Sequence, residues 1–313
     1  MINFVLARNG VGNFNIEASF PPESLTARAV AMFAGECKNK YGVAPSPNAK
    51  CVIRIITPVQ KKGEDDQTFE IHTGRDGDKD LITVTGTGER GILYGLCELL
   101  DQLNFNDGEL VLPDLNLRSI PDIKRRGVER HWRPSLVNRA ELRENFDLIR
   151  TLARKRVNTL LWIDGWVSPG WYRFLTFRHF PPLRKTDEDG TIREAKACLN
   201  EIIEEARRWG MDFYLSGTEF NVPSELIEKA PDLFVTADSG YPVLNLDRQG
   251  TWDFYQAKIR EVMEDFPGLA GIELWTAEAM DISYCHSDRG DAWTLAKRLE
   301  FLYGKTVGAM DMA

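Results

Sequence analysis

The stretch ARKRVNTLLWIDGW, residues 153–166, contains a helix end, a strand and a polar turn in close succession. Residues 141–155 carry apolar side chains at helical spacing, which predicts a helix. Residues 159–163 form a short apolar run, which is typical of a buried strand. Asp164 and Trp166 follow that strand directly. The stretch therefore predicts one helix-to-strand step of a parallel sheet, with a polar loop after the strand.

The same order of strand and helix recurs along the second part of the chain. Strands are predicted at residues 127–132, 159–163, 212–215 and 271–275, and helices at residues 141–155, 194–209, 251–264 and 292–303. Short apolar strands that alternate with helices are typical of a parallel sheet covered by helices. Because no phosphate-binding turn follows these strands, a (β/α)8 TIM-type barrel is favoured over a doubly wound sheet.

The first part of the chain has a different pattern and predicts a small α/β domain. Strands are predicted at residues 2–7 (as an edge strand), 51–56, 68–72, 81–85 and 110–112, and helices at residues 24–42 and 91–103. Residues 113–121 have a proline at each end and predict a linker. We therefore expect an N-terminal α/β accessory domain at residues 1–120 and a barrel catalytic domain at residues 121–313.

The length of the second part limits the barrel. A complete (β/α)8 barrel takes about 250 residues, whereas about 190 follow the linker. The sequence therefore predicts only about the first half of a barrel and a chain truncated at its C-terminus. A half-barrel exposes apolar edges, so a homodimer is a further expectation.

Composition narrows the classes of partner. The chain of 313 residues is 43% hydrophobic and 27% charged, which is typical of a folded globular protein. Its net charge of -8 argues against nucleic acid as a partner, and no apolar stretch is long enough to span a bilayer. The N-terminus lacks the features of a signal peptide. We expect a cytoplasmic protein, or a secreted one if a signal peptide has been removed.

Polar and aromatic residues gather after each predicted barrel strand. In (β/α)8 barrels the catalytic groups lie at the C-terminal ends of the strands. We therefore predict a site there, made by Glu129, Arg130, His131 and Trp132 after the first strand, Asp164 and Trp166 after the second, Ser216, Glu219 and Asn221 after the third, and Trp275, Glu278 and Asp281 after the fourth.

Glu278 is the first candidate for a catalytic group. It lies close to Trp275 and small residues, in surroundings that raise the pKa of a carboxyl and suit a general acid. Asp164 and Glu219 are candidates for binding sugar hydroxyls or for a second catalytic carboxylate, and a helix cap or a loop salt bridge explains them equally well. The tryptophans fit a sugar-binding platform and also ordinary barrel packing.

A second motif, Gly86-Thr-Gly88-Glu-Arg-Gly91, has the GxGxxG spacing between a strand and a helix. A dinucleotide site places this motif in the first strand-to-helix turn of its domain, whereas several predicted strands precede it here. A tight turn that lets the helix pack closely is therefore favoured, and a nucleotide-binding oxidoreductase is the lesser alternative.

Metal and disulfide chemistry have little support in the sequence. The histidines, His72, His131, His179 and His286, show none of the spacings of a metal hydrolase, so neither a metal nor another cofactor is expected. The five cysteines are dispersed and form no CxxC pair, so we expect small buried apolar residues rather than a disulfide scaffold.

Three segments resemble the α-glucuronidase family of glycoside hydrolases, which removes glucuronic acid side chains from xylan fragments. Residues 206–223, 153–166 and 266–278 are similar, in turn, to its YGI-x-x-YLS-x-NFASP stretch, its GIN step from helix to strand, and its DFGGF…SEG strand. Residues 91–96, at the start of a leucine-rich helix, are similar to the small domain before the barrel in those enzymes and in β-hexosaminidases.

The resemblance implies an exo-acting glycosidase that takes an oligosaccharide or glycoside, with Glu278 as its general acid and the base on later strands. Two positions depart from the related patterns. Leu274 stands where the family has a lysine, and Ala277 stands where β-hexosaminidases have the aspartate of an Asp-Glu pair. A non-catalytic carbohydrate-binding protein with a degenerate barrel is the alternative.

Overall fold

The computed structural model describes residues 3–57, 65–131, 138–163, 172, 174–218, 222–236 and 242–275, together with several helical residues between 297 and 308. The chain divides into two compact units. The first comprises Met1–Arg126, Leu148–Asn158 and Arg208–Met211, and the second comprises the remaining residues. No helix in the described ranges is both long enough and apolar enough to cross a bilayer.

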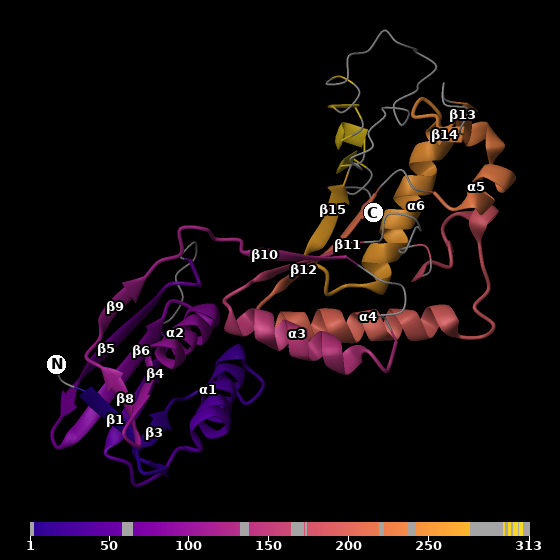
Figure 1. Ribbon diagram of the computed structural model, residues 1–313. Helices are drawn as coiled ribbons and strands as arrows, with labels where there is room; N and C mark the ends of the chain where they lie inside the picture. The colour runs from indigo at the N-terminus through magenta and orange to yellow at the C-terminus, as the bar shows by residue number, and fades with distance from the viewer. Residues whose placement is uncertain are drawn as a thin grey trace. The chain divides into compact units, whose positions relative to one another are not determined.

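A five-stranded mixed sheet with the order β3-β4-β6-β5-β9 forms the centre of the first unit. Its strands are β3 (Phe14–Glu17), β4 (Cys51–Ile56), β5 (Phe69–Asp76), β6 (Lys79–Gly86) and β9 (Asn116–Ser119). Strands β3, β4 and β6 are parallel, while β5 is antiparallel to both β6 and β9. Helices α1 (Leu25–Tyr41) and α2 (Glu89–Gln102) lie side by side against this sheet (Figure 1).

Helix α1 has a clear signal at each end. The hydroxyl of Ser24 accepts a hydrogen bond from the amide of Ala27 at 3.1 Å, which caps the first turn. Gly42 ends the helix with a φ of 72°, a conformation that glycine adopts at little cost. In the core, Phe33 of the helix meets Phe14 of β3 edge to face, with ring centroids 6.0 Å apart. The contact fixes the helix to its sheet.

A smaller antiparallel sheet with the order β2-β1-β8-β7 completes the first unit. Its strands are β1 (Asn3–Arg8), β2 (Val11–Gly12), β7 (Asn104–Asn106) and β8 (Glu109–Pro113). The prediction of an edge strand at residues 2–7 was wrong, because β1 pairs on both sides. The linker prediction for residues 113–121 was also incomplete, since β9 lies there and pairs with the open edge of β5. Both errors concern strand pairing, which is not local in sequence.

The GxGxxG segment is a close-packed turn. The amide of Gly91 donates to the carbonyl of Asp66 at 2.8 Å, and a Cβ on Gly91 would lie only 2.3 Å from the carbonyl oxygen of Thr68. A Cβ on Gly86 would lie 2.6 Å from the amide of Ile92. The chain around Asp66 and Thr68 therefore covers the start of α2, where a dinucleotide site would leave room for a pyrophosphate.

The second unit is built on a parallel four-stranded sheet with the order β10-β11-β12-β15. The strands are β10 (Gly127–His131), β11 (Thr159–Ile163), β12 (Asp212–Thr218) and β15 (Gly271–Trp275). Connections between them contain α3 (Leu142–Arg154), α4 (Thr191–Arg208), α5 (Ser224–Lys229), the hairpin β13 (Phe234–Thr236) and β14 (Pro242–Leu244), and α6 (Gln249–Asp265). This is the opening half of a (β/α)8 TIM-type fold, and the described strands do not close into a barrel.

The two faces of this sheet differ in burial. Leu160, Trp162, Phe213 and Leu215 are at most 1% exposed and share one face. Figure 1 shows α4 and α6 on the same side of the sheet. Right-handed crossovers place successive helices on one face, so these apolar residues form the outer, helix-covered face. The residues between them face the inside of the barrel.

Candidate active site

The carboxyl ends of the four parallel strands share one edge of the sheet. His131, Ile163, Ser216 and Glu273 lie in register across β10, β11, β12 and β15. Neighbouring strands are about 4.8 Å apart, so this row spans about 15 Å. The strand ends that the sequence analysis singled out are thus neighbours in space, at the edge where (β/α)8 barrels hold their chemistry.

Most of the predicted site residues follow these strand ends. Glu129 and Arg130 lie within β10, and the backbones of His131 and Trp275 end β10 and β15. Ser216 lies inside β12 and is fully buried. The remaining predicted residues lie outside the described ranges, and they are Trp132, Asp164, Trp166, Glu219, Asn221, Glu278 and Asp281.

Glu129 lies on the inner face of the sheet. Its register partners across the neighbouring strands are Leu161, Tyr214 and Gly271. A Cβ on Gly271 would lie 3.1 Å from the ring of Tyr214, so the glycine leaves room for that ring beside β15. Glu129 and Glu273 are both exposed. The inner face near the strand ends therefore carries carboxylates and a phenol beside apolar residues.

Arg130 belongs to the opposite face. Its guanidinium lies over the ring of Trp162, 5.5 Å from the ring centre, and 3.7 Å from a carboxylate oxygen of Glu144. The side chain is only 16% exposed. This geometry fits the packing of β10 beneath its helix, so we leave Arg130 out of the proposed sugar-binding residues and keep Glu129.

The loop after β11 is held by a buried carboxylate on α6. Glu261 is 1% exposed, and its Oε1 accepts hydrogen bonds from the amide and the hydroxyl of Thr176 at 2.7 and 2.9 Å. Its Oε2 accepts from the amide of Arg178 at 2.9 Å. Lys196 and the guanidinium of Arg178 lie 3.6 and 3.5 Å from Oε1 and balance its charge.

Glu261 thus binds the amides on both sides of a residue with an unusual backbone conformation. Phe177, between the two amide donors, has a φ of 53°, which is uncommon for a residue with a large side chain. Its ring is 1% exposed and stacks on Tyr172 and Phe254, with centroid distances of 5.6 and 6.2 Å. The hydrogen bonds to Glu261 and the ring contacts together fix the part of this loop that leads into α4.

The sequence did not point to three residues that the structure brings out. Tyr214 and Glu273 are inner-face residues, and alternation along each strand becomes informative only once the register is known. Glu261 carried a local signal, because it falls on the buried stripe of α6 with Tyr255, Lys258 and Val262. A charged residue on an apolar stripe indicates a buried ion pair, or a buried carboxylate that accepts hydrogen bonds from a loop.

Thiol and metal chemistry have no support in the described part of the chain. Burial raises the pKa of Cys37, Cys51 and Cys97 to about 12, so these thiols stay protonated near neutral pH. Among the described residues, no three His, Cys, Asp or Glu side chains are grouped to hold a metal ion. Cys285 and His286 lie outside those residues.

Solved structures share this fold, although no protein-family model and no curated protein matches the sequence. A chitobiase from Flavobacterium johnsoniae aligns with a TM-score of 0.67 and 15% identity over 100% of this chain and 49% of its own. The N-acetyl-β-hexosaminidase of Streptomyces plicatus aligns with a TM-score of 0.59 and 14% identity over 99% of this chain and 61% of its own.

A third similar structure comes from another class of glycoside hydrolase. It is a family 138 enzyme that targets the pectin rhamnogalacturonan II, with a TM-score of 0.60 and 15% identity over 96% of this chain and 33% of its own. The chain therefore shares its fold with a part of these glycoside hydrolases, and it spans about half the length of the chitobiase. At such low identity the likeness establishes the fold alone.

Proposed function

We propose that this chain forms the N-terminal α/β domain and the opening half of the catalytic barrel of an exo-acting glycoside hydrolase. One observation carries the proposal. The chain aligns over its whole length with a chitobiase, with a TM-score of 0.67. The polar residues after every barrel strand add chemical support, because they follow the edge where such folds hold their active sites.

Each proposed role follows from a position along the strands. Glu278 comes three residues after β15 and serves as the general acid. Glu219 comes directly after β12, the strand hydrogen-bonded to β15, and is the nearest candidate for a second carboxylate. The sugar-binding residues are Glu129, His131, Trp132, Asp164, Trp166, Asn221, Trp275 and Asp281.

The finer proposal is an activity like that of the α-glucuronidases. The three segments that resemble that family support it, and Leu274 in place of the family's lysine counts against a bound uronate. A β-N-acetylhexosaminidase is the rival, since one of the similar structures, from Streptomyces plicatus, has that activity in its name. Ala277 counts against it, because this position lacks the carboxylate that orients a substrate acetamide.

A panel of substrates tests the proposal. The full-length gene product would be assayed on aryl glycosides, including β-N-acetylglucosaminide and β-glucuronide, and on xylan fragments with α-linked glucuronic acid. We expect hydrolysis of at least one class, with release of single sugars from the chain end. Saturable sugar binding without hydrolysis of any member would contradict the proposal and favour the non-catalytic carbohydrate-binding alternative.

A further inference from the structure

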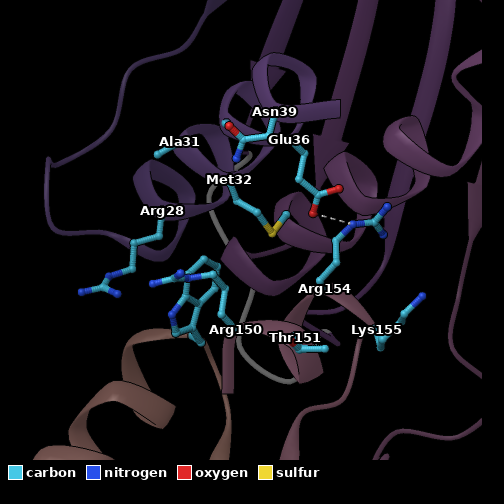
Figure 2. A pocket seen from close by; sticks show the side chains of 11 residues that line it. Arg28, Ala31, Met32, Glu36, Asn39, Arg150, Thr151, Arg154 and Lys155 are labelled. Carbon is cyan, nitrogen blue, oxygen red and sulfur yellow. Dashed lines mark hydrogen bonds and ion pairs between the residues drawn. The ribbon is translucent and has the colours of Figure 1, made fainter. Parts of the chain in front are cut away.

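A pocket in the first unit is lined by none of the predicted catalytic residues. Its volume is about 490 Å³, within the usual range for sites that bind small molecules. The lining residues all belong to the first unit. They come from one stripe of α1, from the end of α3 with the turn after it, and from the residue directly after α4. They are Arg28, Ala31, Met32, Gly35, Glu36, Asn39, Arg150, Thr151, Arg154, Lys155 and Trp209 (Figure 2).

The charge of this lining differs from that of the protein. Four cationic side chains line the pocket, namely Arg28, Arg150, Arg154 and Lys155, whereas Glu36 is its one carboxylate. The whole chain carries a net charge of -8. Cations that converge in a concave site focus a positive potential and favour an anionic ligand. The pocket is thus a local exception on an acidic protein.

Arg154 is held in place before any ligand arrives. Its Nε donates to Glu36 at 3.0 Å, and one of its terminal nitrogens donates to Asp101 at 2.7 Å. The side chain is 18% exposed. Figure 2 shows Met32 between Arg28 and Arg154, so cationic groups stand on two sides of an apolar patch. Its other terminal nitrogen donates to the carbonyl of Cys97 at 3.4 Å, so Arg154 forms a fixed wall of the pocket, and Arg28, Arg150 and Lys155 remain as the cations for a ligand.

The apolar part of the lining indicates more than a simple anion. Ala31 and Met32 face the pocket from α1, and Trp209, which is 5% exposed, closes one wall beneath the guanidinium of Arg28 at 5.9 Å. Inorganic phosphate would fill little of about 490 Å³. Asn39 and Thr151 add groups that both donate and accept hydrogen bonds, as hydroxyl-rich ligands require.

We propose that this pocket binds a carboxylate-bearing saccharide of one or two rings. The guanidinium groups of Arg28 and Arg150 bind the planar carboxylate, the methionine and alanine contact the apolar face of a ring, and Asn39 and Thr151 bind hydroxyls. The choice of a sugar as the ligand rests on the proposed function. None of the predicted catalytic residues lines this pocket, so it would hold an acidic glycan rather than cleave it.

Calorimetry on the full-length protein tests this site. The probes are digalacturonate, the neutral disaccharide xylobiose and inorganic phosphate. We expect digalacturonate to bind at least about tenfold more tightly than either of the others, and its affinity to fall with added salt. Equal affinity for xylobiose, or for phosphate, overturns the proposal.

Matched variants test whether the residues of this pocket bind digalacturonate. The double substitution Arg150→Gln and Lys155→Gln should weaken digalacturonate binding at least about tenfold, because each removes a charged partner. Arg143→Gln, an exposed change on the same helix that does not line the pocket, should leave binding unchanged. Unchanged binding in the double variant overturns the assignment. Glu278→Gln should also leave binding unchanged, which separates this site from the catalytic one.

Discussion

Buried charges hold parts of the loops of this protein in place. Glu261 is the clearest example, since it accepts two amide hydrogen bonds and one hydroxyl hydrogen bond while Lys196 and Arg178 balance its charge. Removing one partner of such a group leaves the others buried and unpaired. The loop after β11 can therefore be tested by substituting this one residue.

Glu261→Ala should lower the free energy of unfolding by about 3–5 kcal/mol. The loss arises because the amides of Thr176 and Arg178 and the cation of Lys196 lose their shared acceptor. Urea denaturation followed by fluorescence measures it. Met263→Ala, a 39% exposed position on the same helix, is the control and should change stability by less than about 0.5 kcal/mol. Equal effects of the two substitutions would contradict the stabilising role of Glu261 in this loop.

Glu264 gives the protein an acid-sensitive contact. Hydrogen bonds from His179, Arg178 and Arg260 lower the pKa of this exposed carboxyl from 4.5 to about 2. A lowered pKa in the folded state stabilises the protein above the ordinary pKa, and the contribution is lost as pH falls through the folded value. Wild type should therefore be more stable than Glu264→Gln at pH 5, and the difference should vanish towards pH 2. Urea denaturation at each pH measures it, and a difference that persists at pH 2 would be inconsistent with this origin.

At the scale of elements, local signals located the long helices and most of the long strands, but they missed the short elements β2, β3, β7, β9, α5, β13 and β14. Ser24 and Gly42 mark the ends of α1, and the apolar runs of β10, β11 and β15 coincide with the predicted strands within a residue. Pairing was harder, because the partner of β9 lies more than forty residues away on β5. Alternation alone could not assign Tyr214 or Arg130 to a face, since the face depends on that pairing.

A substitution in the turn before α2 tests the hypothesis that the GxGxxG segment is a close-packed turn. Gly91→Ala should destabilise the protein by about 1–3 kcal/mol, because the added methyl would meet the carbonyl of Thr68. Gly35→Ala on α1, where a Cβ meets nothing within 4 Å, is a matched control and should be neutral or slightly stabilising. Thermal denaturation compares the two. Tight NAD(P) binding by the wild type would instead support the dinucleotide alternative.

At the scale of the whole molecule, the order of the chain carries most of the functional argument. A small α/β unit precedes parallel strands whose carboxyl ends meet at one edge. The sequence predicted this order from periodicity, and it predicted the strand-end clusters from their positions. The proposed role of Glu278 could not be derived the same way, because distances between carboxylates depend on the conformation of the loops after the strands.

The most direct test of Glu278 as the general acid compares two leaving groups. On a nitrophenyl glycoside the departing group needs little protonation, whereas a departing sugar needs a proton from the acid. In the full-length protein, Glu278→Gln should lower kcat/KM for the natural glycosidic bond by about 10²–10⁴-fold and for the nitrophenyl glycoside far less. Glu300→Gln, at an exposed helical position, should change neither value. Equal losses on both substrates, or no loss on either, would contradict the account.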